Sequence, residues 1–413
     1  MKSNYKRLGD YIREIKTRNS ELKAEKLLGI NIDKFFMPSV ANIVGTDMSV
    51  YKIVKKNQFA CNRMHVGRDY RLPISMSKTD EEFMVSPAYD VFEILDTDAL
   101  YPEYLMMWFS RREFDRNAWF YTDADVRGGL HWKALCDMQL PIPSITKQKE
   151  IVKEYNVIQN RIALNQQLIQ KLEETAQAIY KQWFVDFEFP DENGKPFKSS
   201  GGEMVFNQEL EREIPKGWLV GIFKDLQLDV TDGNYSSKYP SYSEFKQTGV
   251  PFIRGTDFFG KCINPFNLLY ISKEKHKELK KGHTKKGDIL MGTRGEIGKY
   301  AFITNNFIDV NINAQLVRIN GREKYPTSFL GNMLNSTSFK ETLMSSTTGS
   351  ALQQLPISNL MTMKLLIPPN NIILNSCEFL DPVHNHFMLL NEGVFKLMSA
   401  QNLLLSKLAT IEN

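Results

Sequence analysis

An apolar stripe with strict heptad spacing runs along residues 151–183 and recurs at residues 376–408, 225 positions later in the chain. The steps between its members alternate between four and three residues, which places all of them on one face of an α-helix. The members of the first stripe are Ile151, Tyr155, Ile158, Ile162, Asn165, Ile169, Leu172, Ala176, Ile179 and Trp183. This period is typical of a helix that pairs with another helix, so the sequence predicts a long helix here.

The second stripe has the same spacing and is mostly apolar. Its members are Ser376, Leu380, Val383, Phe387, Leu390, Val394, Leu397, Gln401, Leu404 and Leu408. Because one chain carries the stripe twice, we expect the two helices to pair with each other as an antiparallel coiled coil. An amphipathic helix packed on its own domain is the alternative for either stripe alone.

Pro382 interrupts the second stripe. A proline inside a helix costs about 3 kcal/mol, since it removes a hydrogen bond and clashes with the preceding turn. We therefore expect Asp381 and Pro382 to be the N-cap and first residue of a helix that begins late. Residues 377–380 would then form a separate turn or lie beyond a kink.

Shorter segments repeat at nearly the same offset. MQLPIP at 138–143 matches MKLLIP at 363–368, and VFEI at 91–94 falls on LVRI at 316–319. Further back the offset drifts, and KKNQFACNRMHVG at 55–67 resembles KKGDILMGTRGEIG at 285–298. We interpret the chain as two diverged copies of one unit.

Each copy begins with about 140 residues that mix short β-rich runs with helical stretches, as in YDVFEI, GDILMG and PEYLMMWFSRREF. The sequence therefore predicts an α+β fold with two tandem globular α/β domains and two long helices, related by a pseudo-two-fold axis. A Gly/Pro/Ser-rich, charged junction between the copies should have little core of its own. The predicted boundaries are 1–143 and 216–368 for the globular domains, 144–185 and 369–413 for the helices, and 186–215 for the junction.

Composition adds modest limits. The 413 residues carry a net charge of only +4, which neither requires nor excludes a nucleic-acid partner. No apolar run is long enough to cross a membrane, and the first residues lack a secretory signal, so we expect a cytoplasmic protein. The four cysteines are far apart and form no CxxC motif, which favours buried thiols over disulfides or zinc ligands.

The predicted geometry suggests a ruler. The first stripe covers residues 151–183, which corresponds to roughly 50 Å of helix at about 1.5 Å per residue. A rigid spacer of this length could hold two readers one turn or more apart on duplex DNA, whose repeat is about 34 Å. Because the two copies have diverged, their half-sites should differ.

Several segments resemble a known family. The heptad helix followed by AQAIYKQWFVDFEFP, NGKPFKSSGGEMV and IPKGW is similar to the central region of the specificity subunit of type I restriction–modification systems. NQFACNRMHVGR and GDILMGTRGEIG resemble segments of that family's target-recognition domains. The resemblance covers essentially the whole chain, although the C-terminal end lacks a counterpart of QWFVDFEFP.

The resemblance implies a non-catalytic subunit that binds a split, asymmetric site on double-stranded DNA. It also implies two modification subunits as partners, with restriction subunits joining them. S-adenosylmethionine, ATP and Mg²⁺ would then bind only to these partners. A coiled-coil scaffold that binds proteins without reading DNA sequence is the alternative.

The motifs of an enzyme are not found. GTRGEIGKY lacks the first glycine and the Ser/Thr of a phosphate loop, and a strand–turn–strand with tight glycines is the better interpretation. His384 and His386 do not share a helix face, and neither His65 nor His131 has a spaced partner, so we expect no metal site. No catalytic residue is predicted.

Candidate DNA contacts are basic residues and glycines in corresponding loops, because arginine can bind guanine bidentately and lysine meets phosphate. The basic segment 273–286 could instead be a solvated helix surface and loop. The aromatic end of the first helix could be core or a docking surface. The predicted DNA-binding residues are Arg63, Arg68, Arg71, Gly129, Lys238, Arg254, Lys285, Lys286, Arg294, Lys299 and Gly349.

Overall fold

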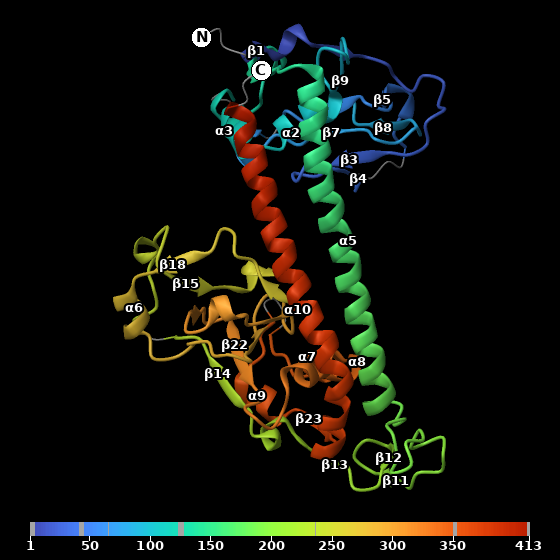
Figure 1. The fold of residues 1–413 in the computed structure, drawn as a ribbon, viewed down its shortest axis with the longest axis vertical. Coiled ribbons are helices and arrows are strands. Elements are labelled where there is room, and N and C mark those ends of the chain that lie inside the picture. The colour runs from blue at the N-terminus through green and yellow to red at the C-terminus, as the bar shows by residue number, and fades with distance from the viewer. Residues whose placement is uncertain are drawn as a thin grey trace. The chain divides into compact units, whose positions relative to one another are not determined.

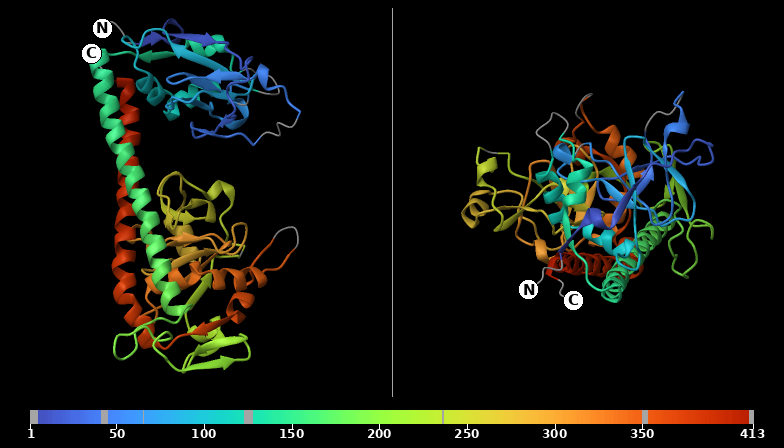
Figure 2. Two further views of the ribbon diagram at one scale, coloured as in Figure 1. Left: turned by 90° about the vertical axis from the view of Figure 1, so that its right-hand side faces the viewer. Right: turned by 90° about the horizontal axis from the view of Figure 1, so that it is seen from above.

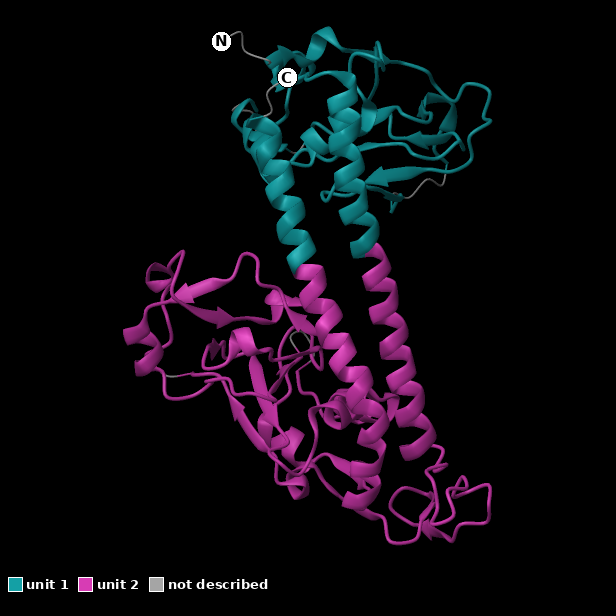
Figure 3. Ribbon diagram, in the orientation of Figure 1, with its two compact units in different colours: residues 1–162, 396–413 teal, residues 163–395 magenta. Residues whose placement is uncertain are grey.

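The computed structural model divides into two compact units, each of which combines helices and strands (Figure 3). Unit 1 comprises residues 1–162 and 396–413, and unit 2 comprises residues 163–395. The structure describes residues 5–40, 45–64, 66–122, 128–235, 237–349 and 353–410. Among these residues no helix is long and apolar enough to span a bilayer.

The main sheet of unit 1 has four antiparallel strands in the order β2-β9-β6-β7. Figure 1 labels β9 and β7 of this sheet. Their bounds are Ile12–Ile15 (β2), Asp90–Ile94 (β9), Phe59–Cys61 (β6) and Ile74–Met76 (β7). Three two-stranded sheets accompany it: β1 (Tyr5–Arg7) with β10 (Gln139–Pro141), β3 (Leu28–Ile30) with β4 (Phe36–Pro38), and β5 (Lys52–Val54) with β8 (Phe83–Val85). The short helices are α1 (Val66–Asp69), α2 (Pro102–Phe109), α3 (Arg112–Phe120) and α4 (Trp132–Asp137).

Unit 2 has a four-stranded antiparallel sheet of corresponding order, β14-β22-β19-β20. Its strands are Asp229–Asp232 (β14), Leu316–Asn320 (β22), Ile289–Gly292 (β19) and Tyr300–Phe302 (β20). A second sheet joins β15 (Val250–Ile253) to β18 (Leu269–Ile271) and β21 (Asn311–Ile312). The strand pairs are β11 (Met204–Asn207) with β12 (Arg212–Pro215), β13 (Leu219–Ile222) with β23 (Lys364–Ile367), and β16 (Phe258–Phe259) with β17 (Cys262–Ile263). The short helices are α6 (Lys273–Glu278), α7 (Thr327–Asn335), α8 (Thr337–Ser345) and α9 (Ile357–Thr362).

The same turn leads into the middle of both main sheets. Before β6 the backbone N–H of Lys55 donates to the Gln58 side chain, and before β19 the N–H of Lys285 donates to the Asp288 carboxylate. The residue before each acceptor has a left-handed backbone, with φ of 64° at Asn57 and 82° at Gly287. Such a backbone favours glycine and asparagine, which is why the KKNQ and KKGD segments can form one turn.

Strand pairing corrects the predicted alignment of the repeat by two residues. Phe59 pairs with Phe92 and Ile289 pairs with Ile319, so Phe92 corresponds to Ile319 rather than to Val317. A slip of two residues keeps every side chain on the same face of a strand, whereas a slip of one reverses the faces. The apolar pattern alone therefore could not distinguish the two alignments.

Two long helices carry the heptad stripes, α5 (Ile145–Phe184) and α10 (Asn370–Lys407). All members of both stripes are buried or half-buried, and none is exposed. In unit 1, Ile151 and Val152 belong to the same core cluster as Leu405 and Leu408. The first residues of α5 thus pack with the last residues of α10.

Unit 2 contains the opposite ends of both helices, which lie side by side and run antiparallel (Figure 2). The rings of Trp183 and Phe379 have centroids 5.9 Å apart, while Asn165 lies beside Gly393. Later residues of α5 therefore lie beside earlier residues of α10, as in an antiparallel pair of helices.

The late start predicted for the second helix is wrong, because α10 is continuous through Pro382. Leu380 and Phe387, on either side of the proline, are buried, so tertiary packing holds both halves of the helix in place. The proline itself is exposed. It therefore lies on the solvent side, where water can satisfy the carbonyl that loses its partner.

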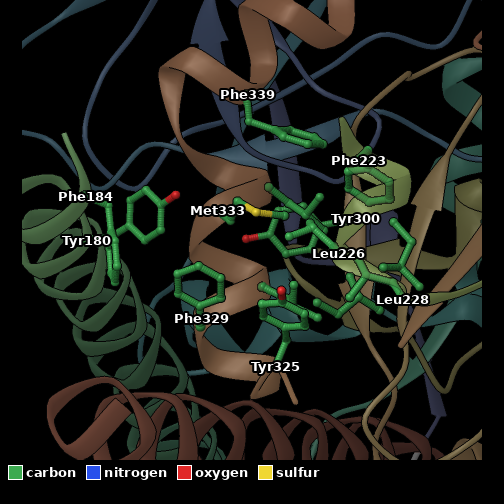
Figure 4. Packing of buried hydrophobic residues seen from close by; sticks show 14 of the residues in the cluster. Tyr180, Phe184, Phe223, Leu226, Leu228, Tyr300, Tyr325, Phe329, Met333 and Phe339 are labelled. Carbon is green, nitrogen blue, oxygen red and sulfur yellow. The ribbon is translucent and has the colours of Figure 1, made fainter. Parts of the chain in front are cut away.

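The junction was expected to have little core of its own, and some of its apolar residues are instead buried in the core of unit 2. Phe187, Phe189 and Ile214 are buried in the main core of unit 2, where Trp218 lies 5.3 Å from Phe187 and 5.6 Å from Phe189 between ring centroids. The aromatic end of α5 joins the same core, since Tyr180 and Phe184 point toward Phe329 of α7 (Figure 4). Its core interpretation thus has direct structural support.

Candidate nucleic-acid interface

The loop after β6 contains Arg63, which is tied into its own unit. Its guanidinium binds the Asp90 carboxylate and the carbonyl oxygen of Leu130. Burial opposes the charge of Arg63, but the hydrogen bond that the guanidinium donates to Asp90 and the attraction of nearby negative charges together raise its pKa. Because these contacts occupy the side chain, the structure gives Arg63 a role in holding the loop.

Arg68 and Arg71 lie in the same segment and are exposed. Each has a surface ion pair, 2.6 Å from Arg68 Nε to Asp69 and 2.7 Å from Arg71 Nη1 to Asp33. Exposed pairs of this kind contribute only about 0–1 kcal/mol. A phosphate or a guanine edge could therefore replace either carboxylate at little cost.

Two glycines join this segment to the chain before α4. The Gly67 N–H donates to the Gly128 carbonyl over 2.8 Å, and a Cβ at Gly67 would lie only 2.7 Å from Gly128 Cα. Gly128 also has a left-handed φ of 56°. Gly129 is less constrained, since its Cβ would meet nothing nearer than the Arg63 carbonyl at 3.8 Å. The close approach requires Gly67 and Gly128, and the prediction had not singled out Gly67.

A corresponding contact recurs in unit 2. The Leu355 N–H donates to the Thr293 carbonyl over 2.9 Å, as the Leu130 N–H donates to the Arg63 carbonyl over 3.0 Å in unit 1. Arg294 follows Thr293 and forms an isolated β-bridge with Gln354. The turn of the loop has a left-handed φ of 74° at Gly295 and 80° at Gly298. The strand–turn–strand predicted for this segment is therefore confirmed by the pairing of β19 with β20.

Arg294 differs from Arg63 because its side chain is exposed. Its guanidinium carbon lies 5.5 Å from the centre of the Tyr235 ring. Tyr235 is close enough to Tyr239 to affect its titration, and Arg254 acts on the same hydroxyl; burial raises the pKa of Tyr239 and Arg254 opposes the rise. These four residues, Arg254, Tyr239, Tyr235 and Arg294, form what we call the Arg/Tyr row.

The two tyrosines of the row were not predicted. They lie in NYSSKYPSYSEF, which contains three tyrosines, four serines and one lysine. Flat aromatic rings and guanidinium groups both stack on nucleic-acid bases and sugars. This composition was the available signal, and it falls between the regular strands on which the prediction depended.

The other candidates in unit 2 have varied surroundings. Lys285 Nζ lies 3.2 Å from Asp229, which also binds the buried Arg318. Lys299 binds Glu296 over 2.7 Å. The guanidinium of Arg254 donates two hydrogen bonds to Asp257, over 2.7 and 3.1 Å.

Lys238, Lys286 and Gly349 are exposed, as Lys285 and Arg294 also are. Lys238 Nζ lies 3.6 Å from Glu278. Gly349 has a left-handed φ of 94° and follows Thr348, which bridges to Gln354 beside Arg294. The structure thus brings Gly349 near Arg294, as it brings Gly129 near Arg63.

The chain is similar to several known proteins. Residues 229–394 match the family model described as the type I restriction modification DNA specificity domain. The specificity subunit of the type I restriction enzyme MjaIX from Methanocaldococcus jannaschii is 26% identical over 327 residues, which cover 76% of this chain and 70% of that protein. The HindI specificity subunit from Haemophilus influenzae is 26% identical over 190 residues, covering 44% of this chain and 40% of that protein.

A solved structure shares the fold. The specificity subunit of a type I restriction–modification system from M. genitalium has a TM-score of 0.53 and 11% sequence identity, with 99% of this chain and 96% of that chain covered. The match to a DNA specificity domain lies within unit 2, and the shared fold combines helices and strands. The chain is similar to type I restriction–modification specificity subunits in its matched domain and in its overall fold.

Proposed function

We propose that this chain reads a split, asymmetric site on double-stranded DNA for a type I restriction–modification complex and catalyses no reaction itself. The globular domains at 1–143 and 216–368 would be target-recognition domains, one for each half-site. The observation that carries the proposal is the recurrence of one loop frame in both units. In each, the N–H of a leucine, Leu130 or Leu355, donates to the carbonyl of the loop that follows the corresponding strand.

The half-sites should differ because the loops present different chemistry. Unit 1 offers exposed Arg68 and Arg71, whereas unit 2 offers the Arg/Tyr row. Direct reading of bases depends on the donors and acceptors that a protein places at the base edges. Loops with one frame and different side chains therefore suit an asymmetric target.

The spacer is proposed to be an antiparallel coiled coil formed by residues 144–185 and 369–413, with 186–215 as the junction. Support comes from the unexposed heptad stripes and from the antiparallel contacts inside each unit. The 40 residues of α5 correspond to about 60 Å at about 1.5 Å per residue. That length approaches two turns of B-DNA at about 34 Å each.

Partners are proposed from the family and from the outer face of α5. Val157, Leu164 and Leu168 are exposed apolar side chains at near-helical spacing on this helix. Apolar exposure of this kind suits a docking partner. We propose two modification subunits carrying S-adenosylmethionine, joined by restriction subunits that use ATP and Mg²⁺, in a cytoplasmic complex. This chain would hold no cofactor.

DNA binding by the assembled complex separates this proposal from a protein scaffold. A subunit that grips DNA should give an affinity that falls steeply with salt, by about 0.9 log units per log unit of salt for each phosphate neutralised. Substituting a base within the site should also weaken binding. Binding that depends on salt but on no base, or no binding at all, would favour the scaffold.

The spacer itself is tested by inserting four residues beside Thr175. Such an insertion lengthens α5 by about 6 Å. The proposal predicts a change in the tolerated gap between half-sites, as read from methylation mapping of cells that carry the complex. An unchanged spacing between the half-sites would contradict the proposal that the helices set this spacing.

A further inference from the structure

Three side chains of unit 2 that do not belong to the Arg/Tyr row converge. His276 comes from α6, His283 from the loop that follows it, and Asp309 from the turn after the 3₁₀ helix Asn305–Phe307. The distance to Asp309 Oδ1 is 3.5 Å from His276 Nε2 and 3.1 Å from His283 Nδ1. One ligand atom from each residue lies within 4.8 Å of the others.

The outer nitrogen of each imidazole already has an oxygen partner. His276 Nδ1 lies 2.5 Å from Asn311 Oδ1, and His283 Nε2 lies 2.6 Å from the Leu279 carbonyl oxygen. These oxygens can only accept, so the nitrogens that face them carry the protons. Lone pairs are then left on His276 Nε2 and His283 Nδ1, both of which face the Asp309 carboxylate.

Three acceptors that point at one another repel unless a proton or a cation lies between them. Histidines that bind metals usually donate their second N–H to a carbonyl or an amide oxygen, which fixes the tautomer and aims the ring. Asn311 and Leu279 provide this arrangement for the two rings here. A tetrahedral ion with bonds of about 2.0–2.1 Å needs ligand atoms roughly 3.4 Å apart, close to the distances that both histidines make with Asp309.

We propose that His276 Nε2, His283 Nδ1 and Asp309 Oδ1 bind a divalent cation of the zinc class, with water as the fourth ligand. Two imidazoles and one carboxylate are ligands that zinc accepts, whereas calcium and magnesium prefer oxygen alone. The Asp309 side chain is 73% exposed, which leaves room for water. The ion would fasten α6 and its loop to the segment that enters β21, and so would hold the edge of the β15–β18–β21 sheet.

Nearby charges reduce the attraction for a cation but do not abolish it. The segment 273–286 is rich in lysine. Lys275 Nζ is engaged by Glu244 at 2.9 Å and by Glu278 at 3.2 Å, and Lys281 Nζ lies 3.4 Å from Asp232. These acidic partners offset part of the positive potential around the site.

The proposal competes with a shared proton. If the Asn311 amide were turned over, its nitrogen, which is buried without a partner, would donate to His276 Nδ1. His276 Nε2–H would then donate to Asp309, and the cluster would need no ion. Metal binding by the full-length chain, freed of any histidine tag, distinguishes the two arrangements.

The experiment titrates the chain with Zn²⁺ and, separately, with Co²⁺, and records the visible absorption of tetrahedral cobalt. The variants are Asp309→Asn and His283→Gln, and the matched control is His386→Gln, which alters an exposed histidine of α10. We expect one ion per chain and an intense cobalt spectrum in the wild type and the control. Since even outer partners of a metal ligand are worth about 10- to 100-fold in affinity, each site variant should bind at least tenfold more weakly.

Asp309→Asn guards against loss of fold, because its side chain is exposed and keeps its shape. Far-UV circular dichroism checks that both variants fold. A wild type that retains no stoichiometric ion, or an Asp309→Asn chain that binds as well as the His386→Gln control, would overturn the proposal in favour of the shared proton.

Discussion

The loops that follow β6 and β19 share a backbone frame and differ in what they do with arginine. In unit 1 the guanidinium of Arg63 is half-buried and held by Asp90. In unit 2 Arg294 is exposed and lies against Tyr235. The loop frame is therefore built from backbone hydrogen bonds and glycines, so its side chains can differ between the two units.

Removing Arg63 is the change expected to have the largest effect on stability. Arg63→Ala leaves Asp90 poorly hydrated without its partner, and breaking such a buried pair costs about 3 kcal/mol. Urea unfolding of the isolated chain should show this loss in the free energy of unfolding. Arg68→Ala, the control from the same loop, should cost no more than about 0.5 kcal/mol because its ion pair is exposed. Equal losses would contradict the assignment of Arg63 to the frame.

Acid should weaken unit 2 through His384. Burial lowers the pKa of His384 to about 4. The pKa of His384 in the folded state lies below its usual value near 6.5. The folded state therefore has its full free energy of unfolding above pH 6.5, and this free energy falls as the pH is lowered toward 4. The loss should reach about 2–3 kcal/mol at pH 4.5.

The repeat provides a comparison for this effect. The corresponding position of α5 is Gln159, which does not titrate. His384→Gln should therefore flatten the fall in unfolding free energy between pH 6.5 and 4.5, apart from a constant packing cost. An unchanged pH profile in this variant would show that other groups cause the acid effect.

A methyl group placed between Gly67 and Gly128 tests whether their close contact supports the loop after β6. Gly67→Ala places a methyl group 2.7 Å from Gly128 Cα, and such overpacking costs about 1–3 kcal/mol. Gly129→Ala should be tolerated, since its methyl group would have room. Amide exchange of residues 59–76, followed by mass spectrometry, should accelerate only in the first variant. Equal exchange in the two variants would show that the glycine contact is unimportant.

Substitution of Arg294 should weaken DNA binding and leave the stability of the chain unchanged. Arg294→Ala is expected to weaken DNA binding by the complex by about 1–2 kcal/mol, the value of a good base contact. Arg294→Lys keeps the charge but lacks the planar fork. If Arg294 reads a base, lysine should restore little of the affinity, whereas full recovery would indicate a phosphate contact.

The two long helices could be predicted from the sequence, because the heptad spacing repeats many times along each stripe. The run PEYLMMWFSRREF was helical as predicted, although it divides into α2 and α3. Pro382 misled the prediction because the penalty for proline is local, while the packing that outweighs it comes from distant residues. The error of two residues in the strand alignment could not be detected from the sequence, because a shift of two residues preserves the apolar pattern.

Contacts between distant residues were not accessible. Lys34 and Asp115 form a buried ion pair of 2.7 Å, in which burial lowers the pKa of the lysine. His276, His283 and Asp309 meet only through the fold of the second sheet. Neither group has a characteristic spacing, so only the tertiary structure reveals it.

Exchange of one globular domain tests whether each domain reads its own half-site. Residues 1–143 are replaced by the corresponding domain of another specificity subunit, and methylated bases are mapped by single-molecule sequencing of the host genome. The account predicts that one half of the recognised site changes while the other half and the gap are retained. A change in both halves would contradict the claim that two loops of one frame read two different half-sites.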